Sequence, residues 1–272
     1  MIVDAHHHFW DPTRRDYPWM AGDELAAIRR PFGPGELRPL LEDNGVDRTI
    51  LVQTVSSLEE TREFLEVAAA VDFVGGVVGW VDLTSPSVAQ SIGSLVSDLL
   101  VGIRHQVHDE PDPRWLLRDD VQGGIAAVGE AGLVYDLLVR ARELPAALET
   151  VRRHGKVSFV IDHAAKPRIA GGSWDGEWEE KLAPFSDEAN VTCKLSGLVT
   201  EARWQSWSVE ELEPYVRRVL AWFGPERCMF GSDWPVCLLA AGYDRVFDAM
   251  QQIVGLDERI FGETARRVYG LV

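Results

Sequence analysis

The strongest constraint on the fold is a regular alternation of two kinds of segment along the 272 residues. Eight short stretches rich in valine, isoleucine and leucine have the length of β-strands, and amphipathic stretches of helical length lie between them. The apolar residues of the short stretches run almost without interruption, which is typical of parallel strands buried on both faces. Strands are expected at residues 1–5, 48–54, 73–81, 101–107, 132–139, 156–162, 190–196 and 227–233.

The intervening segments carry the signals of helices. Leu58 and Leu65 fall on one stripe of their segment, and the pair Ser85-Pro86 is a common helix start. Eight strand–helix units in a chain of this length predict an α/β protein with one (β/α)8 TIM barrel, a single domain over residues 1–272. The alternative, an open doubly wound sheet, would have a glycine-rich phosphate loop after its first strand, where this chain has histidines. Helices are expected at residues 34–45, 57–71, 85–100, 119–131, 144–155, 178–189, 208–224, 244–255 and 257–271.

Charge and cysteine content narrow the class of protein. The net charge of −16 argues against nucleic-acid binding, because an acidic surface repels phosphate. No apolar run approaches the length of a membrane span, and the first residues lack a secretory signal pattern. Cys193, Cys228 and Cys237 are odd in number and lack metal-ligand spacing, so we expect reduced thiols in a cytoplasmic protein. We therefore expect a small-molecule substrate as the partner, with a homo-oligomer left open.

The stretch "DAHHHFWD" at residues 4–11 contains three of the seven histidines. Side chains alternate in direction along a strand, so His6 and His8 are expected on one side and His7 on the other. Two imidazoles on one side, two residues apart, can bind one metal ion or one substrate atom. An expression tag and a purely structural cluster are the alternatives for this triplet.

Further polar residues fall at the expected ends of other strands. Active sites of (β/α)8 barrels lie at the carboxyl ends of the strands, and four of the seven histidines occur at such positions. Scattered core histidines would not repeatedly fall there. The residues selected in this way are His6, His8, Gln53, Trp80, Asp82, Arg104, His105, His163, Lys194, Ser196, Asp233 and Trp234.

Simpler roles remain open for several of these residues. Asp233 could be a turn or helix-capping aspartate, and His163 could cap the following helix. Arg104 could pair with Asp82, and Lys194 would more often reach solvent than substrate. Four tryptophans near the strand ends could form an apolar wall against a sugar ring or could simply pack in loops: Trp10, Trp19, Trp80 and Trp234.

Five motifs, "VDAHHHFWD", "DYPW", "GIRHQ", "VIDHAAKP" and "MFGSDWPV", give the chain a family resemblance over almost its whole length. The chain resembles the amidohydrolase superfamily, and within it the amidohydrolase family 2 branch of L-fuconolactonase-like and L-rhamnonolactonase-like sugar lactonases. The resemblance assigns His6, His8, His163 and Asp233 to the active centre. Arg104 and His105 match the strand-4 segment of this branch.

These four residues could also be metal ligands. Three imidazoles and one carboxylate suit one divalent ion, with zinc the first choice, so the expected ligands are His6, His8, His163 and Asp233. Strand 5 lacks the histidine of metal-rich superfamily members, and no strand-4 lysine is available for carboxylation. A binuclear centre is therefore not expected. A second arrangement, in which His6 and His8 act without metal as hydrogen-bond donors, is also open.

The same residues suit hydrolysis. Asp233 would accept a proton from the attacking water, while His163, Arg104 or a metal would stabilise the oxyanion. No G-x-S-x-G serine motif is present. The expected function is hydrolysis of a lactone ester, from a sugar-derived aldonolactone; a metal-dependent decarboxylase and a non-catalytic sugar-binding protein are the alternatives. The expected catalytic residues are Asp233, His163, His6 and His8, and the expected substrate-binding residues are Arg104, His105, Trp80, Gln53 and Trp234.

Overall fold

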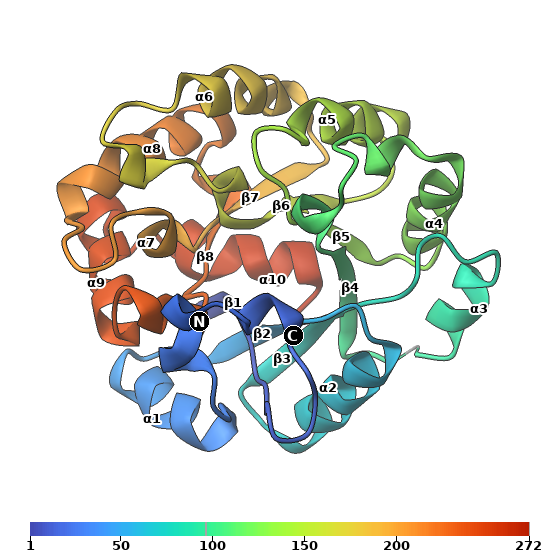
Figure 1. The fold of residues 1–272 in the computed structure, drawn as a ribbon, viewed down its shortest axis with the longest axis horizontal. Helices are drawn as coiled ribbons and strands as arrows, with labels where there is room; N and C mark the ends of the chain where they lie inside the picture. Colours follow the sequence, from blue (N-terminus) through green and yellow to red (C-terminus); the bar gives the residue numbers. More distant parts are fainter. Residues whose placement is uncertain (96, 272) are drawn as a thin grey trace.

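The computed structural model describes residues 1–95 and 97–271 (Figure 1). Its sheet has eight strands in the order of the sequence, and each strand is parallel to its neighbours. All eight expected strands are confirmed, with ends that differ by a few residues. They are β1 (Val3–His7), β2 (Arg48–Val52), β3 (Val74–Gly79), β4 (Leu100–His105), β5 (Val134–Leu137), β6 (Phe159–Ile161), β7 (Val191–Leu195) and β8 (Cys228–Phe230).

The first and last strands meet and bring the sheet round into a barrel. The backbone N–H of His8 donates to the carbonyl of Trp234 at 2.7 Å, and the N–H of Asp233 donates to the carbonyl of His6 at 2.8 Å. These bonds lie at the carboxyl ends of β1 and β8, so they also bring the two segments with the expected catalytic residues side by side. The predicted (β/α)8 barrel is confirmed.

Most of the helices follow one another around the barrel in sequence order, as the progression of colours in Figure 1 shows, whereas the last helix lies near the middle of that view. The helix expected over residues 85–100 is shorter in the structure, where α3 covers Val88–Gly93. It is followed by Ser94, Ser97 and Asp98, which favour turns over helix interiors. Residue 96 of that prediction lies outside the described residues. The helices are α1 (Pro34–Asp43), α2 (Leu58–Ala70), α3 (Val88–Gly93), α4 (Asp119–Glu130), α5 (Leu144–Arg153), α6 (Gly176–Leu182), α7 (Leu198–Glu201), α8 (Val209–Phe223), α9 (Tyr243–Val254) and α10 (Thr264–Tyr269).

The barrel interior is divided into an apolar and a polar half. Side chains of several strands, among them Val3, Val78 and Val160, form an apolar cluster with Tyr269 and Leu271 of the carboxyl-terminal segment. Nearer the carboxyl ends of the strands, the interior is occupied by charged groups that have no access to solvent. This arrangement fills one end of the barrel with hydrocarbon and leaves the other end for chemistry. Among the described helices, none is long and apolar enough to span a bilayer.

Candidate active site

The histidine triplet of β1 is split between the two sides of the strand. His6 Nε2 and His8 Nε2 lie 3.2 Å apart, whereas His7 Nε2 lies 2.8 Å from Thr49 Oγ1 on the other side. The pairing of β1 with β2 shifts register between Asp4 and His7, yet the alternation expected for the histidines is present. Two imidazoles therefore face each other inside the barrel mouth.

Asp233 and His163 complete the cluster. Asp233 Oδ1 lies 3.4 Å from His8 Nε2, 3.8 Å from His6 Nε2 and 3.9 Å from His163 Nε2. The ring centroids of His6 and His163 are 4.4 Å apart. All four side chains are buried. The structure thus brings the four residues expected at the catalytic centre around one point.

The neighbours of the ring nitrogens of His6 and His8 indicate which nitrogen of each ring carries the proton. His8 Nδ1 lies 2.7 Å from the carbonyl of Val52, which can only accept, so we place the proton on Nδ1. His6 Nδ1 lies 3.3 Å from Asp162 Oδ1, and Arg104 NH1, which can only donate, lies 3.2 Å from His6 Nε2. The Nε2 lone pair of His8 then points into the cluster. His6 Nδ1 also lies 3.3 Å from Lys194 Nζ, which can only donate, so the contacts of His6 are compatible with a proton on either ring nitrogen. The 3.2 Å contact between the two Nε2 atoms is satisfied either by a proton on His6 Nε2 or by a cation that both nitrogens bind.

The donor set fits one divalent cation. Zinc bound tetrahedrally at about 2.0–2.1 Å has ligand atoms roughly 3.3 Å apart. The donor separations of 3.2, 3.4 and 3.8 Å among His6, His8 and Asp233 approach this value. The ligand atoms of these three buried residues all lie within 4.8 Å of one another.

Charge states at the cluster follow from burial and neighbours. Burial raises the pKa of Asp233, but nearby His163 and the hydrogen bond from His8 outweigh it and leave the pKa below its ordinary value. Burial lowers the pKa of His163 well below the usual imidazole value. Asp233 is therefore ionised and His163 neutral near pH 7. A carboxylate beside a neutral imidazole can accept a proton from water.

Beneath the cluster lies a group of buried charges, of which the sequence analysis named Lys194 and Arg104 but missed Asp136 and Asp162. Lys194 Nζ lies 2.6 Å from Asp136 Oδ2 and 3.0 Å from Asp162 Oδ1, and Arg104 NH1 lies 3.0 Å from Asp162 Oδ2. Arg104 therefore pairs with Asp162, and the suggested pairing with Asp82 is wrong. Lys194 is fully buried and does not reach solvent. A lone acid in the apolar stretch "GLVYDLLV" was the available signal for Asp136, because an unpaired buried carboxylate is costly.

An unusual backbone turn presents His163. Four consecutive residues, His163, Ala164, Ala165 and Lys166, have φ between 49° and 58° and form a left-handed turn. Such conformations cost non-glycine residues roughly 1–2 kcal/mol each and persist where function requires them. The turn is closed by the N–H of Lys166, which donates to the carbonyl of His163 at 2.8 Å. His163 also packs on Gly197, where a Cβ would lie 2.6 Å from its ring.

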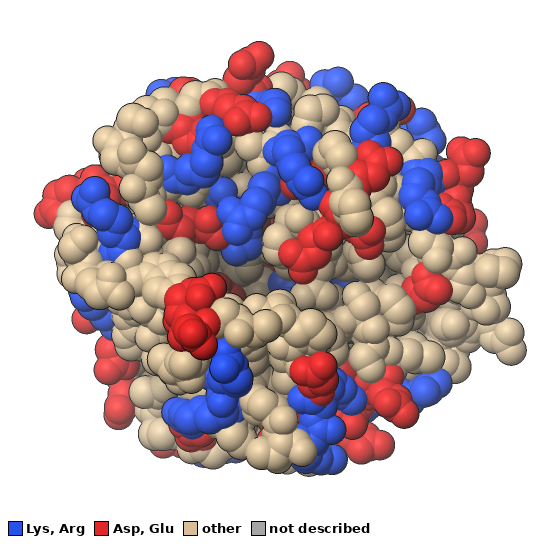
Figure 2. Space-filling view, in the orientation of Figure 1, with Lys and Arg blue, Asp and Glu red and all other residues tan. Residues whose placement is uncertain are grey.

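A cavity of about 360 Å³ opens above the cluster. Its wall comes from the ends of every strand except β3, among the residues that the structure describes. Figure 2 shows the face hollowed near its middle, with both Lys or Arg and Asp or Glu around the hollow. The wall contains His8, Arg104, His163 and Asp233, and also Trp19, which the sequence analysis suggested for an apolar wall. Other wall residues were not assigned to the site by the sequence analysis, among them His108, Arg140, Lys166, Glu201 and Trp204.

Only Arg104 of the five expected substrate-binding residues belongs to this wall in the described part of the chain. Gln53 lies behind it: Gln53 Oε1 accepts from Arg104 NH2 at 3.3 Å, and Gln53 Nε2 donates to the Arg104 carbonyl at 3.2 Å. Trp234 is 1% exposed and packs against Phe9 and Phe32. These two residues support the site and do not line it.

Trp80 and His105 also turn away from the cavity. Trp80 Nε1 donates to His105 Nδ1 at 3.0 Å. His105 Nε2 lies 2.7 Å from Glu110 Oε1, and its ring stacks on Trp115 with centroids 4.2 Å apart. His105 follows Arg104 on β4, and because neighbouring strand residues face opposite sides, only Arg104 reaches the barrel mouth.

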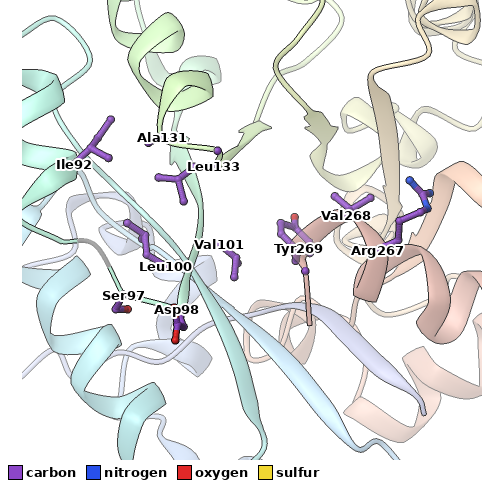
Figure 3. Close-up of a pocket in the computed structure, with 12 residues that line it drawn as sticks. Ile92, Ser97, Asp98, Leu100, Val101, Ala131, Leu133, Arg267, Val268 and Tyr269 are labelled. Carbon is purple, nitrogen blue, oxygen red and sulfur yellow. The ribbon is translucent and has the colours of Figure 1, made fainter. Parts of the chain in front are cut away.

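A second cavity, of about 330 Å³, lies at the opposite end of the barrel. It is formed by the start of β4, the segment before β5 and the end of α10, as Figure 3 shows. Of its described lining side chains, only Asp98 and Arg267 carry charge, and no histidine is among them. Of these two cavities, the one at the carboxyl ends of the strands combines histidines with carboxylates among its described lining residues, and barrel enzymes carry out catalysis at that end.

Known proteins resemble this chain over almost its full length. The amidohydrolase family profile matches residues 3–271. Two relatives are named L-fucono-1,5-lactonase: one from Burkholderia ambifaria is 42% identical over 98% of this chain and 92% of its own, and one from Burkholderia multivorans is 37% identical over 99% and 96%. A crystal structure of a Burkholderia multivorans amidohydrolase with bound zinc covers all of both chains with a TM-score of 0.95 and 35% identity. The protein belongs to the amidohydrolase family.

Proposed function

We propose that the protein is a lactonase, a carboxylic-ester hydrolase that opens the ring of a sugar-derived aldonolactone. The observation that carries the proposal is the buried, ionised Asp233 among the imidazoles of His6, His8 and His163 at the floor of an open cavity. The relatives named L-fucono-1,5-lactonase support a lactone as the substrate. A lactone suits this site because an ester needs less assistance to its leaving group than an amide.

Asp233 acts as the general base in the proposed reaction. Water attacks the lactone carbonyl while Asp233 takes its proton, and a C–O bond forms to give a tetrahedral intermediate. Collapse breaks the bond between the carbonyl carbon and the ring oxygen, and Asp233 returns the proton to that oxygen. Arg104 and His163 lie on the cavity wall where they can stabilise the oxyanion.

We also propose that the site holds one divalent ion, zinc. His6, His8 and Asp233 would bind it, with His163 as the fourth ligand. A bound cation would supply polarisation of the carbonyl and a more acidic water. The zinc in the Burkholderia multivorans amidohydrolase supports the choice of metal. Strand β5 contains no histidine, and its Asp136 pairs with Lys194, so only one ion is proposed.

A panel of aldonolactones in a pH-indicator assay tests the proposal. Acid release with L-fucono-1,5-lactone or a related ring is the expected result. Carbon dioxide release from aromatic acids, without acid release from any lactone, would instead establish the decarboxylase alternative. Saturable binding of lactones without turnover would instead indicate a non-catalytic sugar-binding protein. The acidic charge and the three buried, free cysteines support a cytoplasmic enzyme that binds small molecules and not nucleic acid.

A further inference from the structure

The charges on the cavity wall balance. Its cationic and anionic side chains are equal in number, and burial lowers the pKa of His108 to about 3, so that imidazole is neutral. Arg104 and Asp233 lie at the bottom of the cavity, within the proposed catalytic centre. The charged wall residues are Arg104, Arg140, Lys166, Asp109, Glu201 and Asp233.

Glu201 joins the two cations of the outer wall. Lys166 Nζ lies 2.9 Å from Glu201 Oε1, and Arg140 NH1 lies 3.0 Å from Glu201 Oε2. The Glu201 side chain is only 12% exposed, although it lies at the end of the short helix α7. Arg140 NH2 also lies 3.5 Å from Oε1, so this oxygen contacts both cations. Glu201 thus offsets part of the positive charge that Lys166 and Arg140 would otherwise present to an incoming anion.

We propose that Glu201 determines substrate charge: it pairs with both Lys166 and Arg140, so that the cavity favours a neutral lactone ring over one that carries a carboxylate. The proposal rests on the lactonase function proposed above and names the substrate class of the same site. The physical reason is twofold. A substrate carboxylate beside Glu201 meets a like charge in a largely desolvated wall, and the cations that could bind it are already paired.

The left-handed turn of residues 163–166 makes this arrangement part of the site. His163 belongs to the catalytic cluster, and Lys166, three residues later, lies on the same cavity wall. A substrate group at Lys166 is therefore held close to the reacting centre.

Two lactones that differ at one carbon test the proposal. L-Galactono-1,4-lactone carries a hydroxymethyl group at C6, and L-galactaro-1,4-lactone carries a carboxylate there. The measured quantity is the ratio of kcat/KM for the neutral lactone to kcat/KM for the anionic lactone. We expect Glu201→Gln to lower this ratio by about ten- to a hundredfold, the effect of one charge-assisted hydrogen bond. We expect Lys166→Met to raise it, because one cation is lost.

The control is Glu188→Gln. Glu188 is 18% exposed and accepts from Arg152 Nε at 2.7 Å, so it resembles Glu201 in burial and in pairing with an arginine, but it lies outside the described cavity wall. The ratio of kcat/KM for the neutral lactone to kcat/KM for the anionic lactone should be the same in Glu188→Gln as in the wild type. A Glu201→Gln ratio within about twofold of wild type, or equal shifts in both cavity variants, would overturn the proposal.

Calorimetric binding of the same two lactones to the Asp233→Asn protein, with and without Glu201→Gln, measures the charge preference without turnover. Failure of the wild type to hydrolyse any lactone would reject the lactonase function. The binding ratio would then decide the role of Glu201 separately.

Discussion

Lys194 and Asp136 form an ion pair of 2.6 Å in the barrel interior, with both side chains fully buried. Asp136 also accepts from the hydroxyl of Tyr269 at 2.9 Å, and Lys194 contacts Asp162 at 3.0 Å. Burial raises the pKa of Asp136 to about 6, although Lys194 acts in the opposite direction. His6 Nδ1 lies 3.3 Å from Lys194 Nζ, so this ion pair lies directly beneath the cluster of His6, His8, His163 and Asp233.

Lys194→Met should destabilise the protein by about 3–5 kcal/mol, because it leaves buried carboxylates without their cation. Urea unfolding measures the change. The matched control is Lys181→Met, which removes an exposed pair with Glu177 at 2.7 Å and should cost no more than about 1 kcal/mol. Equal losses in the two variants would show that the buried pair contributes nothing beyond a surface pair.

Asp233→Asn should lower kcat by at least about a hundredfold, because it keeps the shape of the side chain and removes the base. Asparagine tolerates positive φ, so the φ of 58° at this position is no obstacle to folding. Asp82→Asn is the control, since Asp82 accepts from the N–H of Thr84 at 2.9 Å and lies outside the described cavity wall. Near-normal turnover by Asp233→Asn would mean that another group takes the proton.

Elemental analysis of purified protein should find one zinc per chain, and His8→Ala should reduce that content. Treatment with a chelator should lower kcat without abolishing it, because Asp233, His163 and Arg104 remain in the cavity wall. Readdition of zinc should restore the rate. Full activity of metal-free protein would end the metal proposal and leave His6 and His8 as hydrogen-bonding groups.

The free energy of unfolding of the Ala165→Gly variant should be at least about 1 kcal/mol higher than that of the Ala147→Gly variant. Both alanines are fully buried. Ala165 has φ of 58°, where glycine removes a steric cost, whereas Ala147 lies inside α5, where glycine costs about 1 kcal/mol. Thermal or urea unfolding of both variants provides the comparison, and equal effects would argue against strain in the left-handed turn.

His108 should make the protein less stable in acid. Burial, followed by the charges of Lys166, Arg140 and Arg104, lowers its pKa from 6.5 to about 3. Between these values the unfolded chain binds a proton that the folded chain does not, so the free energy of unfolding falls as pH falls, by up to about 1.4 kcal/mol per pH unit. His108→Gln lacks this contribution, so the wild type should lose more stability than the variant between pH 6.5 and 5. Parallel losses would contradict the lowered pKa.

The sequence alone was enough to predict the architecture and the grouping of His6, His8, His163 and Asp233. Strand-length apolar runs alternate with amphipathic helices eight times, and this number of repeats is typical of the (β/α)8 barrel. The two-residue period of a strand separates His7 from His6 and His8, and the rule of strand ends then adds His163 and Asp233. These inferences depend on local periodicity and topology, which neighbouring residues in the chain determine.

The tertiary structure decided which of the other residues meet. Trp80 and His105 stand at strand ends yet contact each other, and Glu110 and Trp115 hold His105 away from the cavity. Lys194 lies on β7, but its partner Asp136 comes from β5 across the barrel.

The outer wall depended on the tertiary structure as well. Lys166, Arg140 and Glu201 come from three different loops and helices and meet only above the assembled strands. Pairing of charges across the barrel depends on register, tilt and burial, which are properties of the assembled barrel and not of any single segment.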